Sequence, residues 1–327
     1  MPEPAAPVLG PADVAAPRFD SIETAIGHTP LVELPALSPR PGIRLLAKLE
    51  GLNPSGSVKD RIARALLADL EASGRLGPGT TILEATSGNT GIAMAMLARR
   101  RGHPLTVVLP DNVTQERRQL LTLYGAEIIE SPGELGSNGS IALARRLAAN
   151  DGRYVMADQY ANAANPRAHY ETTGPEILAA CPEIDVFVAG LGTGGTLMGV
   201  GRRLREANPA VRLIAAEPLP GEQVQGLRSL ADGFVPEILD PTLLDGRFLV
   251  SSTDAIRGLR ALLEREGILG GVSSGAVLVA ARRVAATMER GTIVLLLADG
   301  GWKYLSDGLW TRDLAELEAD GETRNWW

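Results

Sequence analysis

The segment VFVAGLGTGGTLMGVGRRL, residues 186–204, decides the fold class of this chain. It opens with the short apolar run Val186–Ala189, passes through the glycine-rich turn Gly190–Thr196 and continues as a helical pattern to Asn208. A buried strand, a tight turn and a helix in this order form one unit of a parallel α/β fold. The same alternation recurs along the chain. The sequence therefore predicts an α/β protein with two lobes of mostly parallel, twisted sheet flanked by helices.

Apolar runs and helical periodicity place the other elements. Strands are predicted at 45–49, 81–84, 105–109, 127–129, 154–156, 186–189, 213–216 and 293–297, and helices at 61–73, 91–101, 115–124, 140–150, 196–208, 253–266 and 276–290. The stretch 162–175 is the predicted passage between the lobes. The predicted organisation is a disordered arm (1–18), a lobe whose first strands are allowed to cross into the other lobe (19–165), a second lobe (166–310) and a tail (311–327). We expect Trp326 and Trp327, at the end of that tail, to cover a cleft or to meet a partner, because undocked they expose much apolar surface.

Composition and charge narrow the functional classes. The 327 residues carry a formal net charge of −7, which disfavours nucleic acid or an anionic membrane as a partner. No apolar run approaches the length of a membrane span. A single cysteine, Cys181, cannot form an internal disulfide, and we expect it to be a buried thiol in a cytosolic protein. The histidines His28, His103 and His169 show no metal-ligand spacing, so no metal site is expected.

Two glycine-containing loops, each between a predicted strand and a predicted helix, are candidate sites. In NPSGSVKDR (53–61), Lys59 stands in the first turn of a helix, where the dipole disfavours a cation, so a role beyond that of a surface lysine is indicated. In GLGTGGT (190–196), backbone N–H groups converge on a helix start and can hold a phosphate. This loop also fits the dinucleotide motif G-x-G-x-x-G, with Glu217 about twenty residues further on. A nicotinamide dehydrogenase is therefore an alternative, although it leaves the Lys59 loop unexplained.

A third loop, EATSGNTG (84–91), begins another helix. Its residues with good N-cap propensity are Thr86, Ser87, Asn89 and Thr90. Because a helix needs only one cap, the loop favours the binding of an anion such as a carboxylate over simple capping. A further turn, GVSSG (271–275), opens the last predicted helix. As structure it is a cap, and as chemistry Ser273 offers a neutral hydroxyl to a ring nitrogen.

These loops, taken with other short blocks, resemble the cysteine synthase (O-acetylserine sulfhydrylase) family of pyridoxal-phosphate enzymes. That family shares its fold with the tryptophan synthase β subunit (fold type II), and the likeness runs from about Ile22 to Ser306. The other blocks are GHTPLV (27–32), ERR (116–118), YGA (124–126), QY (159–160), NP (165–166) and TTGPE (172–176). The resemblance implies a two-lobed fold, pyridoxal 5′-phosphate as the cofactor and a homodimer.

The resemblance also implies a role for each candidate residue. Lys59 is implied to carry the cofactor as an internal aldimine and, once released, to act as a general base. Asn89 is implied to face the 3′-oxygen of the cofactor, and Ser273 its pyridine nitrogen. The cofactor phosphate is implied to rest on Gly192, Thr193, Gly194, Gly195 and Thr196. The substrate is implied to be bound by Thr86, Ser87, Asn89, Thr90 and Gln159.

The implied activity is cysteine synthase-type β-replacement. An O-activated L-serine and a sulfur nucleophile are converted to L-cysteine through an α-aminoacrylate on the cofactor. The donor can be O-acetylserine, O-phosphoserine or another serine derivative. The acceptor can be sulfide, thiosulfate or the thiocarboxylate of a sulfur-carrier protein. A specialised β-substituted alanine synthase is an alternative within the family, and a non-catalytic pyridoxal-phosphate-binding regulatory protein is an alternative of another class.

Charge near the predicted cleft bears on the identity of the donor. A phosphate-bearing donor needs a nearby cation, preferably arginine. The segment EPLPGE (217–222) has no base and contains Glu222, which argues against O-phosphoserine. The blocks SSG (273–275) and GWKYLS (301–306) are nonetheless closest to the branch that uses O-phosphoserine, and Arg228 could reach the site. The sequence leaves the donor open.

Overall fold

The computed structural model describes residues 18–86 and 88–323. The predicted arm therefore lies outside the described residues except for its last residue, and so do Ser87, Trp326 and Trp327. Across the part of the chain that is described, the strands form a six-stranded and a four-stranded sheet. Neighbouring strands are parallel except for β1 and β2, which are antiparallel. The predicted α/β class with mostly parallel sheets is confirmed.

The order of the strands separates the two sheets along the sequence. The six-stranded sheet has the order β1 (Leu31–Glu33), β2 (Ile43–Leu49), β10 (Gly291–Leu297), β7 (Val186–Gly190), β8 (Arg212–Pro218) and β9 (Gly246–Val250), and the four-stranded sheet has the order β5 (Glu127–Ser131), β4 (Leu105–Pro110), β3 (Thr81–Ala85) and β6 (Tyr154–Met156). Every predicted strand is present, and β1 and β9 are additional. We propose the predicted division into lobes 19–165 and 166–310; the pairing of β2 with β10 supports the crossing of the first strands into the second lobe.

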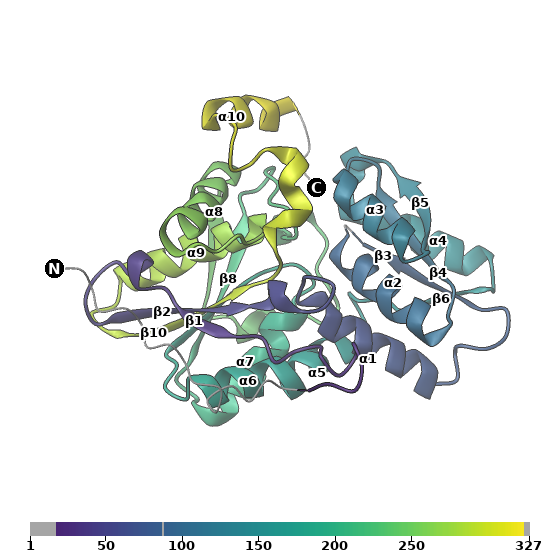
Figure 1. Cartoon of the computed structure of the whole chain (residues 1–327), viewed down its shortest axis with the longest axis horizontal. Helices are drawn as coiled ribbons and strands as arrows, with labels where there is room; N and C mark the ends of the chain where they lie inside the picture. Colours follow the sequence, from purple (N-terminus) through teal and green to yellow (C-terminus); the bar gives the residue numbers. More distant parts are fainter. Residues whose placement is uncertain (1–17, 87, 324–327) are drawn as a thin grey trace.

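Helices cover both faces of each sheet (Figure 1). The helices are α1 (Lys59–Ala72), α2 (Asn89–Arg101), α3 (Gln115–Leu123), α4 (Gly136–Asn150), α5 (Ala164–Ala168), α6 (Gly174–Ala180), α7 (Gly195–Ala207), α8 (Ser252–Glu266), α9 (Val272–Ala286) and α10 (Leu314–Thr323). In Figure 1, α8 and α9 lie above the six-stranded sheet and α6 and α7 below it, whereas α2, α3 and α4 surround the four-stranded sheet at the right. The predicted passage 162–175 is helical from Ala164 onward and lies between β6 of one sheet and β7 of the other.

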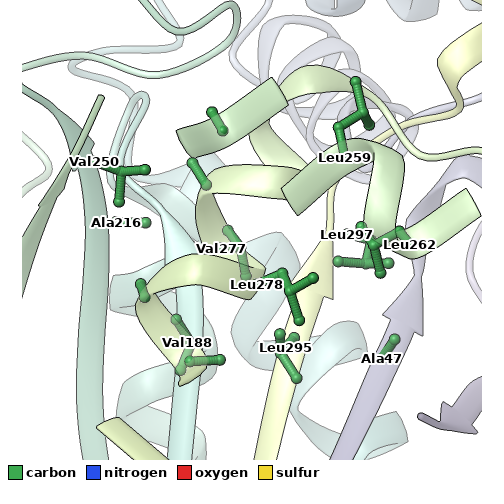
Figure 2. Packing of buried hydrophobic residues seen from close by; sticks show 14 of the residues in the cluster. Ala47, Val188, Ala216, Val250, Leu259, Leu262, Val277, Leu278, Leu295 and Leu297 are labelled. Atoms are coloured by element: carbon green, nitrogen blue, oxygen red, sulfur yellow. The ribbon is translucent and has the colours of Figure 1, made fainter. Parts of the chain in front are cut away.

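Side chains alternate in direction along each strand, and this explains how one sheet contributes to two hydrophobic cores. Val186 and Val188 of β7 pack in the cluster that contains α8 and α9, whereas Phe187 and Ala189 pack in the cluster that contains α6 and α7. Successive side chains of a strand point to opposite faces, so a strand covered on both faces is apolar throughout. Figure 2 shows Val188 beneath α9, with Val277 on that helix directed toward the sheet. Large parts of the apolar surface are thereby removed from water. This burial is the largest favourable contribution to the free energy of folding.

The environment of the single cysteine agrees with the sequence. Cys181 is buried, with 5% of its surface exposed, as predicted. Among the described residues, no helix is both long and apolar enough to cross a membrane. The same residues contain no group of three or more His, Cys, Asp or Glu side chains arranged to hold a metal ion.

The contact between α8 and α9 depends on a glycine. A Cβ atom on Gly275 would overlap the carbonyl oxygen of Ala255 and the backbone nitrogen of Leu259. Gly275→Ala is therefore expected to lower the free energy of unfolding by about 3 kcal/mol, because backbone atoms cannot move aside as a flexible side chain can. Denaturant unfolding measures the loss. Gly77→Ala is the matched control, since its Cβ would meet no described atom within 4 Å, and a similar loss in both variants would contradict the explanation.

Candidate active site

The loops after the parallel strands of both sheets surround one cavity of about 270 Å³. Ligands of open α/β sheets bind beyond the carboxyl ends of the strands, where the connecting loops leave space. β3 is followed by Thr86, β6 by Gln159, β7 by Gly192 and β10 by Asp299, and all four residues line the cavity. Helix α1 adds Lys59, which is its first residue. Both sheets thus contribute to a single site.

Most of the residues predicted from the sequence come together here. The cavity lining includes Lys59, Thr86, Asn89, Thr90, Gln159, Gly192, Thr193 and Ser273. A smaller cavity of about 40 Å³ shares part of this wall, and its lining includes Lys59, Gly192, Thr193, Gly194, Thr196 and Ser273. Gly195 is instead the first residue of α7, where a side chain would overlap the amide of Asn165. The prediction for Ser87 lies outside the described residues.

Lys59 connects the two cavities because it lines both. Burial lowers the pKa of its amine to about 8, although the nearby Asp299 carboxylate acts in the opposite direction. The ordinary pKa of a lysine is about 10.4. The positive end of the α1 dipole also disfavours the ammonium form. A larger fraction of Lys59 is therefore neutral and nucleophilic near neutral pH than for a surface lysine.

Thr86, Thr90 and Gln159 line the cavity at the start of α2, and each is held by hydrogen bonds. Thr90 Oγ1 donates to Gln159 Oε1 at 2.7 Å, and Gln159 Nε2 donates to the Ala85 carbonyl at 2.9 Å. Thr86 Oγ1 accepts a hydrogen bond from the Gly88 N–H at 2.9 Å. All three side chains are buried and held by these partners. They present oriented hydroxyl and amide groups at a helix N-terminus, an arrangement that suits a carboxylate.

The glycine loop before α7 fits a phosphate group. Thr193 and Thr196 line the smaller cavity, into which the N-terminal turn of α7 opens. Gly192 leaves space that a side chain would fill, since a Cβ there would lie 2.9 Å from the Gly226 carbonyl oxygen. His169 Nε2 lies 3.3 Å from Thr196 Oγ1, and burial lowers the pKa of His169 well below its usual value. Hydroxyl and backbone donors beside a neutral imidazole fit the phosphate of the cofactor that the resemblance implies.

Three residues for which the sequence predicted no individual role form a hydrogen-bonded group with Asn89. Asp299 Oδ2 accepts hydrogen bonds from Asn89 Nδ2 at 2.7 Å and from the Tyr304 hydroxyl at 2.5 Å. Lys303, on the 3₁₀ helix η8 (Gly301–Asp307), donates to Asn89 Oδ1 at 2.8 Å. The available signal was the polar sequence that follows directly on the apolar strand β10. That position alone does not reveal the partner of each side chain.

Arg228 stands in the wall of the larger cavity. Its guanidinium carbon lies 5.2 Å from the ring centre of Tyr160 and 4.5 Å from that of Phe234, and its Nη1 donates to Asn138 Oδ1 at 2.6 Å. Stacking on two aromatic rings and a hydrogen bond hold a cation with little cost in side-chain entropy. The sequence expectation that Arg228 could reach the site agrees with this position.

Comparison with known proteins connects this geometry to a family. Residues 22–299 match the family model described as pyridoxal-phosphate dependent enzyme. The chain is 42% identical over 294 residues to cysteine synthase B of Pseudomonas aeruginosa, a match that covers 90% of this chain and 98% of the relative. It is 44% identical over 303 residues to O-ureido-L-serine synthase of Streptomyces lavendulae, covering 89% and 92% of the two chains.

Solved structures agree with these sequence matches. The crystal structure of O-ureido-L-serine synthase superimposes with a TM-score of 0.84 at 41% identity, covering 92% of this chain and 100% of that chain. A cysteine synthase structure from Entamoeba histolytica superimposes with a TM-score of 0.83 at 33% identity, covering 95% and 98%. Similarity of this extent spans both sheets and the cavity between them.

Proposed function

The chain belongs to the pyridoxal-phosphate-dependent enzymes of the cysteine synthase family, and from this premise we propose that Lys59 is the residue that carries the cofactor in a cysteine synthase-type β-replacement. The observation that carries the proposal is the position of Lys59. Its amine, with a pKa lowered to about 8, borders both the cavity with the glycine loop and the cavity with Thr86, Thr90 and Gln159. The reaction converts an O-activated L-serine and a sulfur nucleophile to L-cysteine.

Each wall of the site has a distinct task in this proposal. Bound pyridoxal phosphate supplies a carbonyl carbon for attachment of an amine and a ring that withdraws electrons from the α-carbon of the substrate. The neutral Lys59 amine would hold the cofactor and, when free, would accept the α-proton at Nζ. The Thr86 hydroxyl, the free N–H of Gln159 and the Thr90 hydroxyl, once it turns from Gln159 to the ligand, bind the substrate carboxylate and orient the α-carbon toward Lys59.

The other predicted residues hold the cofactor ring and phosphate. Gly192, Thr193, Gly194, Gly195 and Thr196 bind the phosphate at the start of α7. Asn89 donates to the 3′-oxygen from the start of α2. Ser273, in the first turn of α9, presents a hydroxyl to the pyridine nitrogen, a partner that cannot stabilise a full positive charge as a carboxylate would. Ser87 is also proposed as a ligand of the substrate carboxylate, from its place in the sequence.

Charge in the cavity wall supports a donor whose β-substituent is uncharged while bound, such as O-acetyl-L-serine. The lining cations are Lys59 and Arg228, whereas the lining carboxylates are those of Glu134, Glu222, Asp232 and Asp299. Glu222 accepts hydrogen bonds from the backbone N–H and the hydroxyl of Ser252 at 2.7 and 2.6 Å, so it also holds the start of α8. A dianionic phosphate would be repelled by this majority of carboxylates. O-phospho-L-serine is the second candidate, because Arg228 is available to it.

The test combines covalent labelling with a comparison of donors. Borohydride reduction of the purified enzyme followed by peptide mapping should place a pyridoxyl group on Lys59. Steady-state formation of cysteine from sulfide should then show a larger kcat/KM with O-acetyl-L-serine than with O-phospho-L-serine. A label on another residue would overturn the role of Lys59, and a preference for O-phospho-L-serine would select the second candidate.

The lowered pKa of Lys59 predicts how cofactor capture depends on pH. Only the neutral amine attacks a carbonyl, so the rate of pyridoxal phosphate capture by cofactor-free enzyme should rise about tenfold per pH unit below pH 8 and level off above it. Stopped-flow absorbance measures this rate. Pyridoxine 5′-phosphate, which has the same phosphate but no carbonyl group, is the control, and its binding should be flat between pH 7 and 9. A capture rate still rising steeply above pH 9 would indicate an ordinary lysine.

Assembly and cellular context extend the proposal. We propose a cytosolic homodimer whose partners are an amino-acid substrate and a sulfur donor. Relatives named for the synthesis of amino acids support the amino-acid substrate. The single cysteine, which cannot form an internal disulfide, supports the cytosolic location. Delivery of sulfur by a carrier protein is an additional prediction. Light scattering during size-exclusion chromatography would test the homodimer, and turnover with a protein thiocarboxylate in place of sulfide would test the carrier.

A further inference from the structure

Lys303 is a second lysine next to the proposed cofactor site. It lies on η8, and its side chain is fully buried. Its ammonium donates to the Gly56 carbonyl at 3.1 Å and to Asn89 Oδ1 at 2.8 Å. Gly56 belongs to the loop that precedes Lys59, and Asn89 begins α2. One cation therefore ties the segment that carries Lys59 to the segment that carries Asn89, and both of these residues are proposed cofactor ligands.

The partners of Asn89 determine the orientation of its amide. On one side Lys303 can only donate a hydrogen bond, and on the other side the Asp299 carboxylate can only accept one. The reversed amide would place N–H groups against an ammonium and an oxygen against a carboxylate. A primary amide has two N–H groups, and only one of them can be directed at Asp299. The second can serve a ligand in the cavity that Asn89 lines.

We propose that Lys303 is a positioning residue for the cofactor: it fixes the Asn89 amide so that an N–H is presented to the 3′-oxygen. This role rests on the proposed function, in which Asn89 is a cofactor ligand. Lys303 itself acts through Asn89. Removing the ammonium would leave the Asn89 amide able to rotate, and the N–H directed to the cofactor would be lost part of the time.

The surroundings of Lys303 keep it charged and in place. Burial lowers its pKa to about 8, while the Asp299 and Asp60 carboxylates oppose the shift, so the ammonium form prevails at neutral pH. The Lys303 backbone carbonyl accepts a hydrogen bond from Thr114 Oγ1 at 2.9 Å, which anchors η8 to the segment before α3. A buried cation without such compensation would be costly. The alternative is that Lys303 merely joins segments of the fold, without influence on Asn89.

A double-mutant cycle separates these two explanations. The affinity of cofactor-free enzyme for pyridoxal phosphate is measured, from its visible absorption band, in wild type, Lys303→Met, Asn89→Ala and the double variant. We expect Lys303→Met to weaken binding at least tenfold in the wild-type background and less than twofold in the Asn89→Ala background. Equal losses in both backgrounds, or no loss in the single variant, would overturn the proposal. Should Lys303→Met fail to fold, the same cycle with Lys303→Leu, which likewise has no N–H donor for Asn89 Oδ1, decides the question by the same criteria.

Lys48→Met is the matched control. Lys48 is likewise buried, and its ammonium binds Glu176 at 2.6 Å, away from the lining of either cavity. This variant should lower the melting temperature and leave cofactor affinity unchanged, whereas a tenfold loss of affinity would mean that any buried lysine has this effect. A wild type with neither a visible band nor a borohydride label on Lys59 would contradict the proposed function. A normal wild type with additive variants would contradict the role of Lys303 alone.

Discussion

Replacing Lys59 with alanine is expected to lower kcat for cysteine formation by at least about 10³-fold while the protein stays folded. The substitution removes the amine that holds the cofactor and also the proposed general base, and the second function alone contributes about 10²- to 10⁴-fold in enzymes. Lys59 supports no hydrophobic core, since it stands at the cavity wall. Initial rates with saturating pyridoxal phosphate and O-acetyl-L-serine measure the effect, and circular dichroism verifies the fold.

Lys59→Arg is the control that separates charge from nucleophilicity. A guanidinium keeps the positive charge and the reach of the side chain, yet it does not deprotonate in proteins. We expect this variant to be as inactive as Lys59→Ala and to resist borohydride labelling. Turnover within tenfold of wild type in either variant would remove Lys59 from the mechanism.

Replacing Arg61 with methionine is expected to lower the free energy of unfolding by about 3–5 kcal/mol. The Arg61 guanidinium binds Glu50 at 2.7 and 2.8 Å and Glu176 at 2.7 Å, and the side chains of Arg61 and Glu50 are both 0% exposed. Methionine fills a similar space but leaves the Glu50 carboxylate buried without its partner. Denaturant unfolding at neutral pH measures the loss.

An exposed ion pair provides the comparison for Arg61. Arg44 binds Glu33 at 3.0 Å, but these side chains are 55% and 47% exposed. Because water screens such a pair, Arg44→Ala should cost less than about 1 kcal/mol. Equal losses in the two variants would show that burial does not control the contribution of these ion pairs.

Acid should weaken the same buried network. Burial alone would raise the pKa of Glu176, but hydrogen bonds from Arg61 and Lys48 outweigh it and lower the pKa to about 2. An unfolded glutamate titrates near pH 4.3, so the contribution of Glu176 is complete above that pH and is lost as the pH falls through about 2. The stability difference between wild type and Arg61→Met should therefore shrink between pH 4.3 and 2.

The sequence predicted the fold and the first layer of the site because both depend on local patterns. Each predicted strand is found, and Lys59, Asn89 and Gly195 begin their helices next to the loops that single them out. Six of the seven predicted helices begin one to four residues earlier than predicted, since their first turns are polar or glycine-rich and show no apolar periodicity, whereas α3 begins at the predicted residue, Gln115. β9 was missed because its exposed positions alternate with partly buried ones at the edge of the sheet.

The side-chain hydrogen bonds that complete the site could not be predicted from the sequence. Asn89 meets Asp299 across 210 positions and Lys303 across 214 positions. No local spacing indicates such partners, and the sequence alone does not distinguish a buried lysine from an exposed one. The same limit applies to Arg61 and Glu176, which are 115 positions apart. Only the folded chain brings these charges together.

The place of β10 between β2 and β7 has a consequence for synthesis on the ribosome. The four-stranded sheet draws all its strands from residues 81–156, so it is complete once that stretch has emerged. The larger sheet must wait for residues 291–297, and until then the edges of β2 and β7 that β10 will join present unpaired backbone groups. The nascent protein thus completes its smaller sheet early and remains vulnerable to misassociation until its last strand is made.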